Sequence, residues 1–362
     1  MKVAIFCKVI DNFGDAGFCL RLARSLANRV KIIEIFCDDI ILIKKMSAVN
    51  DHNRNYLPKN LFIHNYDRDS LLDASNVDLV IEAYRAEPPI EFLKKIHFLT
   101  GVKRVILDYL VTEEKMNPFL NHYAPDYKLL KYYSNYGWVN SSSARRVWLA
   151  PGFTSRSAGL ITGGWKKVSN TSRNKFRKYI LNSSETKIKK NKLSKPESIF
   201  IICIFLYQAN DIYFDFRAPK GFDGIAVWRP KSIDMNQIDF DSALQSCDFN
   251  CVRGEDSFLS AHNAAASQWK VPFVWQPYFE KNEGHKKKFE GWKNIFPDNE
   301  FHSYWEFARL VASRNNKSLI YNWGVFTSSF DLFKDFFHAN CLNILKRKSL
   351  EQSILECVKA DC

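Results

Sequence analysis

The sequence contains no apolar run of membrane-spanning length. Its longest such run, residues 199–206, has eight residues, whereas a transmembrane helix needs about 20. The apolar run near the N-terminus, residues 3–7, is shorter and is closed by Lys8, so it lacks the length of a signal peptide. We therefore expect a cytoplasmic protein with no membrane segment.

Zinc-ligand spacing is absent as well. The nine cysteines include no Cys-x-x-Cys pair, and Cys247 and Cys251 are followed by no Cys/His pair at zinc spacing. Their number is odd, and most are expected to be reduced, buried and packed as small apolar residues. The cysteines therefore indicate neither a metal centre nor a disulfide framework, which agrees with a reducing cytoplasm.

The positive charge is concentrated in one segment. The chain has 52 Lys+Arg and 39 Asp+Glu, a net charge of +13, which by itself suggests a nucleic-acid or acidic partner. Residues 166–195 hold eleven basic residues and one acidic residue, a net +10, so only +3 remains elsewhere. This segment is rich in Ser, Asn and Thr and offers only Phe176 and Tyr179 as aromatic platforms. We expect a solvated loop or loosely helical linker, and no nucleic-acid partner.

Strand and helix patterns alternate in two successive halves. They predict an α/β fold of two Rossmann-like domains with helices at the C-terminus. The predicted strands cover residues 3–8, 31–37, 77–83, 103–107, 198–206, 224–228, 249–252 and 271–275, and helices occupy 14–29 and much of 304–357. The predicted parts are domains at 1–163 and 197–343, a basic linker or insert at 164–196, and a C-terminal helix within 344–362 that could pack back on the first domain.

The first predicted strand runs into the acidic sequence DNFGDAG at residues 11–17. Open parallel sheets bind ligands outside the carboxyl ends of their strands, so this loop is a candidate site. One interpretation makes Asp15 a helix N-cap and Asp11 a turn residue. The other makes one a general base and the other a holder of a cationic substrate group. The loop lacks a Gly-x-Gly-x-x-Gly pattern, so nothing in it indicates NAD.

A second candidate loop, RGEDSF at residues 253–258, follows the strand predicted at 249–252. Arg253, the first amides of a helix and the hydroxyl of Ser257 would suit a diphosphate. Glu255 and Asp256 would then face neutral hydroxyls, such as those of a sugar. The alternative is a surface salt-bridge cluster in which Asp256 or Ser257 caps the helix.

Seven motifs occur in order along the chain: VIDNFGDAGFCLRLARSL, VIEAY, LDYLVTEE, LAPGFTSRSAGLI, FLY, CDFNCVRGEDSF and VPFVWQPY. In this combination the sequence resembles the elongation factor P arginine rhamnosyltransferases. The resemblance spans most of the chain outside the basic segment and the C-terminal tail. It implies a GT-B fold, with two Rossmann-like domains facing each other across a cleft. It also implies an inverting, metal-independent transfer of L-rhamnose from dTDP-β-L-rhamnose to an arginine of translation elongation factor P, without a cofactor.

The resemblance further implies roles for individual residues. Asp15 would be the general base, Asp11 would help to hold the acceptor arginine, and Glu255 would be a second essential carboxylate. The implied donor-binding residues are Phe205, Tyr207, Gln237, Arg253, Gly254, Asp256, Ser257 and Tyr278. His262 and His285 are expected to be ordinary surface or helix-lining histidines, because a carboxylate already fills the role of the base.

Two other functions stay open from the sequence. A GT-B enzyme with a different nucleotide sugar or acceptor would keep the donor pocket without needing Asp11 and Asp15 to modify elongation factor P. A basic RNA-associated protein with a vestigial fold would bind RNA through residues 166–195 in a salt-dependent way. Deletion of that segment should then abolish RNA affinity, whereas transferase activity should largely survive.

Overall fold

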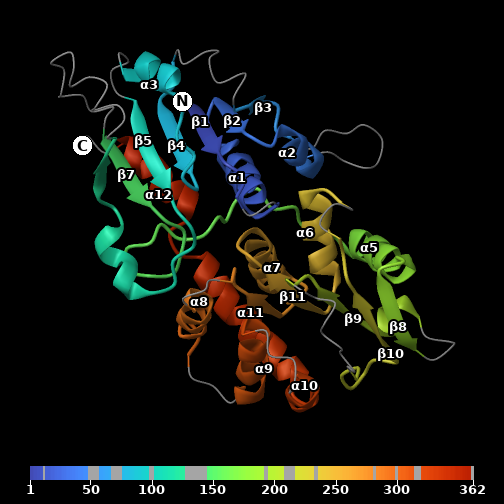
Figure 1. The fold of residues 1–362 in the computed structure, drawn as a ribbon. Helices are drawn as coiled ribbons and strands as arrows, with labels where there is room; N and C mark the ends of the chain where they lie inside the picture. The colour runs from blue at the N-terminus through green and yellow to red at the C-terminus, as the bar shows by residue number, and fades with distance from the viewer. Residues whose placement is uncertain are drawn as a thin grey trace. The chain divides into compact units, whose positions relative to one another are not determined.

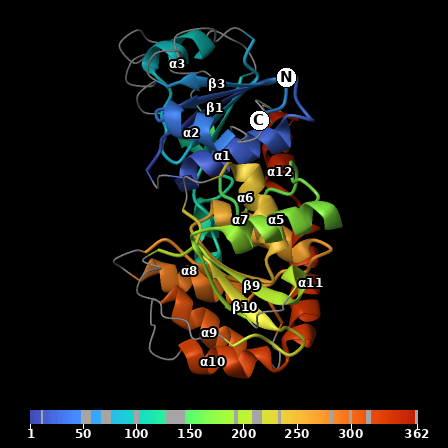
Figure 2. The same ribbon diagram turned by 90° about the vertical axis from the view of Figure 1, so that its right-hand side faces the viewer.

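The computed structural model describes residues 1–10, 13–47, 57–66, 76–97, 102–126, 145–190, 195–207, 217–231, 235–279, 283–297, 301–313 and 319–359. The chain divides into two compact units. Unit 1 comprises Met1–Gly164 and Lys348–Cys362, and unit 2 comprises Trp165–Arg347. Figures 1 and 2 show the elements of each unit.

Unit 1 is built around a seven-stranded sheet (Figure 1) with the order β3-β2-β1-β4-β5-β7-β6. Its strands are β1 (Lys2–Cys7), β2 (Ile32–Cys37), β3 (Leu61–Asn65), β4 (Leu79–Ala83), β5 (Lys103–Leu107), β6 (Tyr123–Pro125) and β7 (Arg145–Leu149). Every pair of neighbours is parallel except β6 and β7. Residues 3–7 of β1 are fully buried, as is typical of a parallel strand covered on both faces.

Helices cover both faces of this sheet. The helical elements of unit 1 are α1 (Phe13–Leu26), α2 (Ile40–Ser47), α3 (Ile90–His97), the 3₁₀ helix η1 (Glu114–Phe119) and α12 (Leu350–Lys359). Ala4 and Phe6 share a core cluster with Phe92 of α3. Because side chains alternate along a strand, Ile5 points to the opposite face, where α1 and α12 lie (Figure 2).

A buried ion network joins the middle strands of unit 1. The guanidinium of Arg104 donates from Nε to Glu82 Oε1 at 2.9 Å and lies 2.8 Å from Asp126 Oδ2. Arg146 Nη1 donates to the second oxygen of Glu82 at 2.9 Å. Two positive and two negative charges thus compensate one another where desolvation would otherwise be costly. Since Glu82 is the penultimate residue of β4, the network fixes the carboxyl end of that strand.

Unit 2 contains a five-stranded sheet with the order β12-β11-β9-β10-β8. Its strands are β8 (Thr186–Lys190), β9 (Ile199–Ile204), β10 (Gly224–Trp228), β11 (Phe249–Arg253) and β12 (Phe273–Gln276). All neighbours are parallel except β8 and β10. The predicted α/β fold, with two Rossmann-like halves and C-terminal helices, is confirmed.

An aromatic core joins the later helices of unit 2 to this sheet. The helical elements are α5 (Asn170–Asn182), η3 (Pro196–Ser198), α6 (Gln237–Ser246), α7 (Asp256–Ala266), α8 (Gly284–Lys293), α9 (His302–Ala312), α10 (Leu319–Thr327) and α11 (Phe330–Leu345). Tyr304 of α9 packs against Phe333 of α11 with ring centroids 4.2 Å apart. Its hydroxyl donates to the carbonyl of Phe273 in β12 at 2.5 Å. Among the described residues, no helix has the length and apolar character needed to cross a membrane.

The basic segment differs from the linker that the sequence suggested. Residues 170–190 form α5 and β8, and β8 pairs with β10 as the edge strand of the sheet. Arg177 is 2% exposed and donates to Asp248 Oδ2 at 2.9 Å, and Arg173 donates to Asp248 Oδ1 at 3.0 Å. The segment is polar in composition. Arg173 and Arg177 are nevertheless structural residues, because they bind the carboxylate of Asp248, which is distant in the sequence. Deleting residues 166–195 would therefore remove an integral part of unit 2.

The C-terminal helix α12 is tied to the segment through which the chain leaves unit 1. Glu351, fully buried, accepts hydrogen bonds from the N–H and hydroxyl of Thr162 at 3.2 and 2.9 Å and from the N–H of Gly163 at 3.0 Å. The N–H of Leu350 donates to the carbonyl of Leu160 at 2.9 Å. One carboxylate therefore holds the last residues of unit 1 before Trp165 against the helix that returns to it.

Replacing Arg177 with alanine should destabilise unit 2 by roughly 3–5 kcal/mol, because Asp248 would lose a buried partner. The carbonyls of Ser246 and Pro196 would lose their donor as well. Seven of the nine tryptophans lie in Trp165–Arg347, so tryptophan fluorescence during urea unfolding reports on this unit.

The neighbouring Lys178→Ala is the matched control. Lys178 lies exposed on the same helix, and such surface changes usually alter stability by no more than about 0.5 kcal/mol. Equal stabilities of the two variants would show that α5 is not an integral part of unit 2.

Candidate functional site

The strand order of unit 1 reverses between β1 and β4. From β1 the chain moves outward to β2 and β3, and from β4 it moves the other way to β5 and β7. Ligands of open α/β sheets bind at such a reversal, outside the carboxyl ends of the strands. The loop that leaves β1 here leads to Asp15, and the loop that leaves β4 begins with Tyr84.

Asp15 occupies the first turn of α1 and is 2% exposed. Its Oδ2 accepts a hydrogen bond from the N–H of Ile10 at 2.8 Å, which closes the loop between β1 and α1. Because α1 begins at Phe13, Asp15 lies inside the helix and is not its N-cap. A carboxylate in a first helical turn is favoured by the helix dipole. Asp11, the other predicted carboxylate of this loop, lies outside the described residues.

The side chain of Tyr84 packs beside α1. The sequence analysis assigned no role to this residue. Its φ is +52° and the φ of the next residue, Arg85, is +62°, a left-handed pair that costs of order 1 kcal/mol or more per residue. The buried ring packs edge-on against Phe18 of α1 at 5.7 Å and stacks on Tyr109 at 4.5 Å. Such backbone strain concentrates at functional sites. The motif VIEAY contains Tyr84, but its spacing does not reveal this conformation.

Cys7, the last residue of β1, is not suited to act as a nucleophile. Its thiol is buried, and its pKa is held well above the usual value by a hydrogen bond with Cys19, by burial and by the negative charge of Asp15. A thiolate is the reactive form of cysteine. The eight described cysteines are all free thiols, and seven of them are buried, as predicted.

The strand order of unit 2 reverses between β9 and β11. The segment after β9 carries Phe205 and Tyr207, and β11 ends at Arg253. The guanidinium of Arg253 lies 4.4 Å from the ring centroid of Phe205 and 4.9 Å from that of Tyr207. Arg253 Nη1 also donates to the carbonyl of Leu206 at 3.1 Å. Two aromatic rings and one carbonyl therefore orient a cation at the carboxyl edge of the sheet.

The turn between β11 and α7 is held by its own side chains and by β12. Gly254 has φ +62°, and its carbonyl accepts from Trp275 Nε1 at 2.7 Å. The hydroxyl of Ser257 accepts from the N–H of Arg253 at 3.2 Å and donates to the Arg253 carbonyl. Ser257 therefore shapes the turn that presents Arg253 and the start of α7.

The acidic residues of this turn have different partners. Glu255 occupies the N-cap position of α7, and its carboxylate lies 3.5 Å from Lys288 Nζ of α8. Asp256, in the first turn of α7, accepts from Gln237 Nε2 at 3.0 Å to each oxygen. The predicted donor residues Gln237 and Asp256 are therefore brought together.

Tyr278 joins the same group through Tyr207. The two rings contact edge to face, with centroids 5.9 Å apart, and the ring of Tyr278 is 53% exposed. Gln276, which ends β12, accepts from the N–H of Tyr207 at 2.8 Å and fixes the register of this segment. The eight predicted donor-binding residues thus gather at the carboxyl edge of one sheet, where the sequence analysis did not foresee the supporting role of Gln276.

A family model described as "Elongation-Factor P (EF-P) rhamnosyltransferase EarP" matches residues 3–215 and 232–359. The chain belongs to this EarP family. Its relatives include protein-arginine rhamnosyltransferases of Shewanella oneidensis and Pseudomonas putida. The first is 25% identical and aligned over 87% of each chain, and the second is 24% identical and aligned over 79% of each. That of Neisseria meningitidis is 25% identical over 84% of this chain and 78% of its own.

Solved structures that resemble this EarP family member include glycosyltransferases. A structure described as the basis for EarP-mediated arginine glycosylation of EF-P has a TM-score of 0.39 and 14% identity, covering 100% of this chain and 99% of its own. The spinosyn rhamnosyltransferase SpnG has a TM-score of 0.46 and 10% identity, over 99% and 100% of the two chains. With scores in this range, the fold assignment rests on the two sheets themselves.

The donor half of this EarP family member contains one Asp-x-Asp sequence, Asp239–Phe240–Asp241, which sequence reasoning overlooked. Asp239 accepts from Asn236 Nδ2 at 2.8 Å at the start of α6. Asp241 is buried and accepts from the hydroxyl of Ser260 at 2.7 Å. Both carboxylates therefore have structural partners. Within the described ranges, no group of three or more His, Cys, Asp or Glu side chains is arranged to hold a metal ion.

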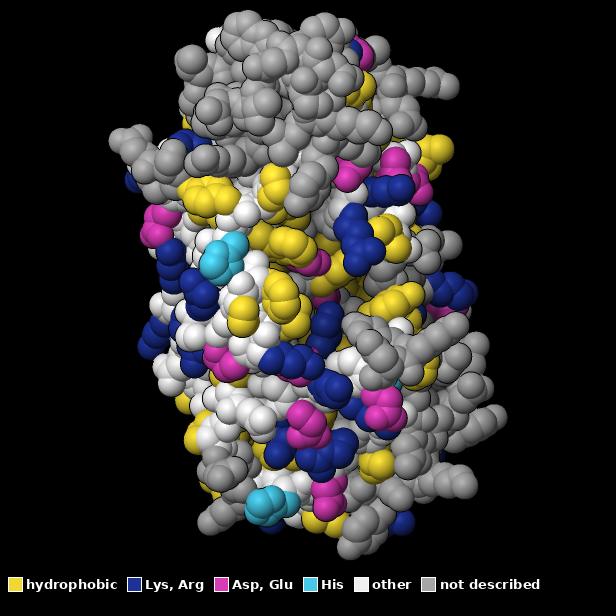
Figure 3. Space-filling model, turned by 60° about the vertical axis from the view of Figure 1, so that its left-hand side comes forward, with side chains coloured by type: hydrophobic (Ala, Val, Ile, Leu, Met, Phe, Trp, Pro, Cys, Tyr) yellow, Lys and Arg dark blue, Asp and Glu magenta, His cyan; other side chains and the backbone are white. Residues whose placement is uncertain are grey.

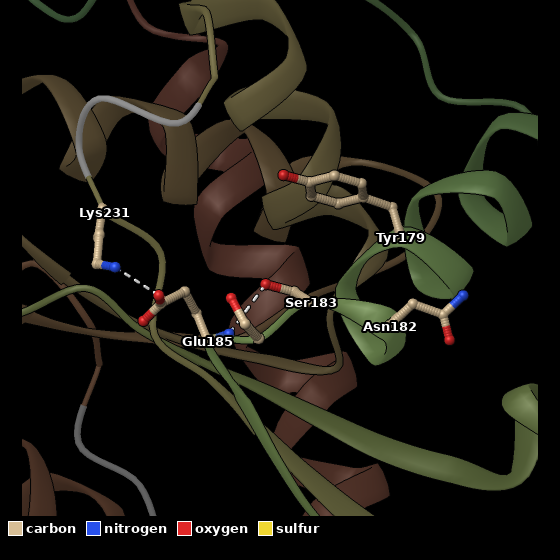
Figure 4. Close-up of a pocket in the computed structure, with 6 residues that line it drawn as sticks. Tyr179, Asn182, Ser183, Glu185 and Lys231 are labelled. Atoms are coloured by element: carbon tan, nitrogen blue, oxygen red, sulfur yellow. Dashed lines mark hydrogen bonds and ion pairs between the residues drawn. The ribbon is translucent and has the colours of Figure 1, made fainter.

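A surface pocket of unit 2 lies beside α5 and β8 (Figure 4). It is lined by Tyr179, Asn182, Ser183, Ser184, Glu185 and Lys231, and Lys231 pairs with Glu185 at 2.5 Å. None of the predicted site residues lines it. The donor-binding residues gather instead at β9 and β11, on the other side of β10 in the sheet order.

His262 is a structural histidine, as expected. It is fully buried in α7 among Phe258, Phe273 and Trp292, and Trp292 Nε1 donates to its Nε2 at 3.2 Å. Burial lowers its pKa to about 3, so the ring stays neutral in the folded chain. His285 is also buried, in α8.

The low pKa of His262 should make unit 2 less stable in mild acid. The unfolded chain takes up a proton near pH 6.5, whereas the folded ring does so only near pH 3. The contribution of His262 to the free energy of unfolding is therefore fully present above pH 6.5 and is lost as the pH falls towards 3. Between pH 7.5 and 5.5 this one group should account for about 1.4 kcal/mol of lost unfolding free energy.

The measurement is urea unfolding at both pH values for the wild type and His262→Gln, which keeps an acceptor for Trp292. The variant should lose this part of the pH dependence. The exposed His302→Gln is the matched control and should behave like the wild type. If His262→Gln loses as much unfolding free energy between pH 7.5 and 5.5 as the wild type, this result contradicts a buried neutral ring at His262.

Proposed function

We propose that this chain transfers L-rhamnose from dTDP-β-L-rhamnose to an arginine side chain of translation elongation factor P, with inversion at the sugar. The observation that carries the proposal is the family match, which includes both the Asp15 loop and the Arg253 loop. The geometry supports it because each loop lies at the position where its own sheet would bind a ligand. Unit 1 then supplies the acceptor side and unit 2 the donor side.

The donor diphosphate is held by Arg253 and the first amides of α7. Helix N-termini and guanidinium groups both favour phosphate oxygens. As the glycosidic bond breaks, negative charge grows on the leaving diphosphate, and fixed donors at this place stabilise it. Phe205 and Tyr207 contact the guanidinium of Arg253 and, with Gln237, line the nucleobase pocket, and Tyr278 reaches the diphosphate. Asp256 and Ser257 lie around the diphosphate and sugar, and Gly254 forms the turn that carries them.

Transfer is a single displacement. A guanidinium nitrogen of the acceptor arginine attacks C1 of the sugar, while the bond from C1 to the diphosphate oxygen breaks on the opposite face. Asp15 takes the proton that the nitrogen loses, and dTDP leaves with the electron pair of the broken bond. A guanidinium is a poor nucleophile because it stays protonated at ordinary pH. Base assistance at that nitrogen is typically worth about 10²–10⁴ in rate.

Carboxylates also position the acceptor. An arginine side chain binds a carboxylate through two parallel hydrogen bonds, which fixes the plane of the guanidinium. Asp11 has this role in the proposal, and Glu255 is the second essential carboxylate. The N-terminal turn of α1 places partial positive charge beside the carboxylate of Asp15. The main effect of this carboxylate contact is to localise the lone pair on one nitrogen of the acceptor guanidinium.

The proposal is tested by intact-mass analysis of elongation factor P after incubation with the protein and dTDP-β-L-rhamnose. One deoxyhexose on one arginine is expected.

Asp15→Asn should lower turnover by at least 10²-fold, because the amide cannot accept the proton, and should leave donor affinity nearly unchanged. Asp239→Asn, a carboxylate with a structural partner in unit 2, is the control. Normal turnover by Asp15→Asn would exclude Asp15 as the base.

A further inference from the structure

Unit 1 displays a compact group of exposed apolar side chains on η1 and β6. Met116, Phe119 and Tyr123 are 37%, 58% and 48% exposed, and Pro118 and Pro125 are exposed as well. We call these five residues the η1–β6 platform. In Figure 1 this part of the chain lies on the left of the molecule, and the view that brings that side forward shows hydrophobic side chains gathered on the surface (Figure 3). Aromatic residues and methionine are the types that interfaces favour.

Side-chain hydrogen bonds hold the η1–β6 platform in place. Glu114 accepts from the N–H and the hydroxyl of Ser155, both at 3.0 Å, and Asn117 Nδ2 donates to that hydroxyl at 3.0 Å. Asn121 Nδ2 donates to the carbonyl of Arg156 at 2.9 Å. Beneath the surface, Leu120 packs with two buried residues of the neighbouring segments. Apolar side chains that are already ordered lose less entropy when a partner covers them.

The η1 part of the η1–β6 platform lies on the same edge of the sheet as Asp15, whereas β6 runs antiparallel to β7 away from that edge, with Pro125 opposite Arg145. η1 follows the carboxyl end of β5 and is bonded to residues 155 and 156, which follow the carboxyl end of β7. Three strand spacings separate β1 from β7 in the order β1-β4-β5-β7, or about 14 Å at ~4.8 Å per spacing. A standard interface covers about 800 Å² per partner, which as a disc has a radius of about 16 Å. A folded acceptor centred on Asp15 therefore reaches η1, whereas β6, one strand spacing further at about 19 Å, lies beyond the rim of that disc.

We propose that the η1–β6 platform is the docking surface for the folded acceptor protein, which it contacts through apolar side chains near the modified arginine. The inference rests on the proposed function, because the acceptor arginine must reach Asp15. Such a docking surface adds selectivity for the acceptor protein, which the catalytic loop alone cannot supply. Two carboxylates recognise any exposed guanidinium, whereas an apolar surface at a fixed distance selects the protein that carries it.

The test is steady-state kinetics of Met116→Ser/Phe119→Ser with folded elongation factor P and dTDP-β-L-rhamnose. Loss of two apolar anchors should raise the KM for elongation factor P at least tenfold. The kcat and the KM for the donor should stay within twofold, because neither residue touches the reacting groups. Ile41→Ser is the matched control, since Ile41 is 80% exposed on α2 of the same unit, and it should leave all constants unchanged.

The outcomes separate the two proposals. Failure of the wild-type protein to modify elongation factor P would overturn the proposed function, and the docking surface with it. A modifying wild type together with an unchanged KM in the double variant would overturn the docking surface alone. So would a concentration-dependent dimer that the double variant abolishes without a change in KM, because the platform would then bind a second copy. Should the double variant fail to fold, the single variant Phe119→Ser provides the same test on η1.

Discussion

The reversal of strand order in each sheet determines where the chemistry can lie. In unit 1 the reversal falls between β1 and β4, and in unit 2 between β9 and β11. Consecutive parallel strands need crossover helices on the faces of the sheet, so only the loops at a reversal diverge and leave room for a ligand. Every candidate residue with a described position follows one of these strands or is bonded to residues that do. The DNFGD loop and the RGEDSF loop thus each follow one strand of a reversing pair, β1 in unit 1 and β11 in unit 2.

The way each site is held follows from burial near those strand ends. In unit 1 the compensated network of Glu82 and Arg104 fixes the end of β4, and the strained Tyr84 extends from it against α1. In unit 2 the guanidinium of Arg253 lies over the rings of Phe205 and Tyr207. The difference suits the proposed roles, because a base must stay anionic and a diphosphate site must stay cationic.

The central strands and the site loops were predictable because their signals are local. Residues 3–7 and 199–204 are continuous apolar runs, and the candidate loops at 11–17 and 253–258 each come shortly after a predicted strand. The segment of α5 and β8 was not predictable in this way. The buried residues of α5 are Arg177 and Ile180, and only Ile180 is apolar. The segment is stabilised by Asp248, some 70 residues further along the chain. The pairing of Gln237 with Asp256 and the φ of Tyr84 likewise depend on tertiary contacts.

The stereochemistry of the product tests the central claim most directly. Elongation factor P modified by this protein with dTDP-β-L-rhamnose can be digested, and the glycosylated arginine peptide examined by NMR at the anomeric carbon. Single displacement assisted by Asp15 predicts an α-rhamnosyl arginine, the inverted configuration. A β-linked product would require a covalent intermediate or a front-face attack, and would contradict the assignment of Asp15 as the base in one displacement.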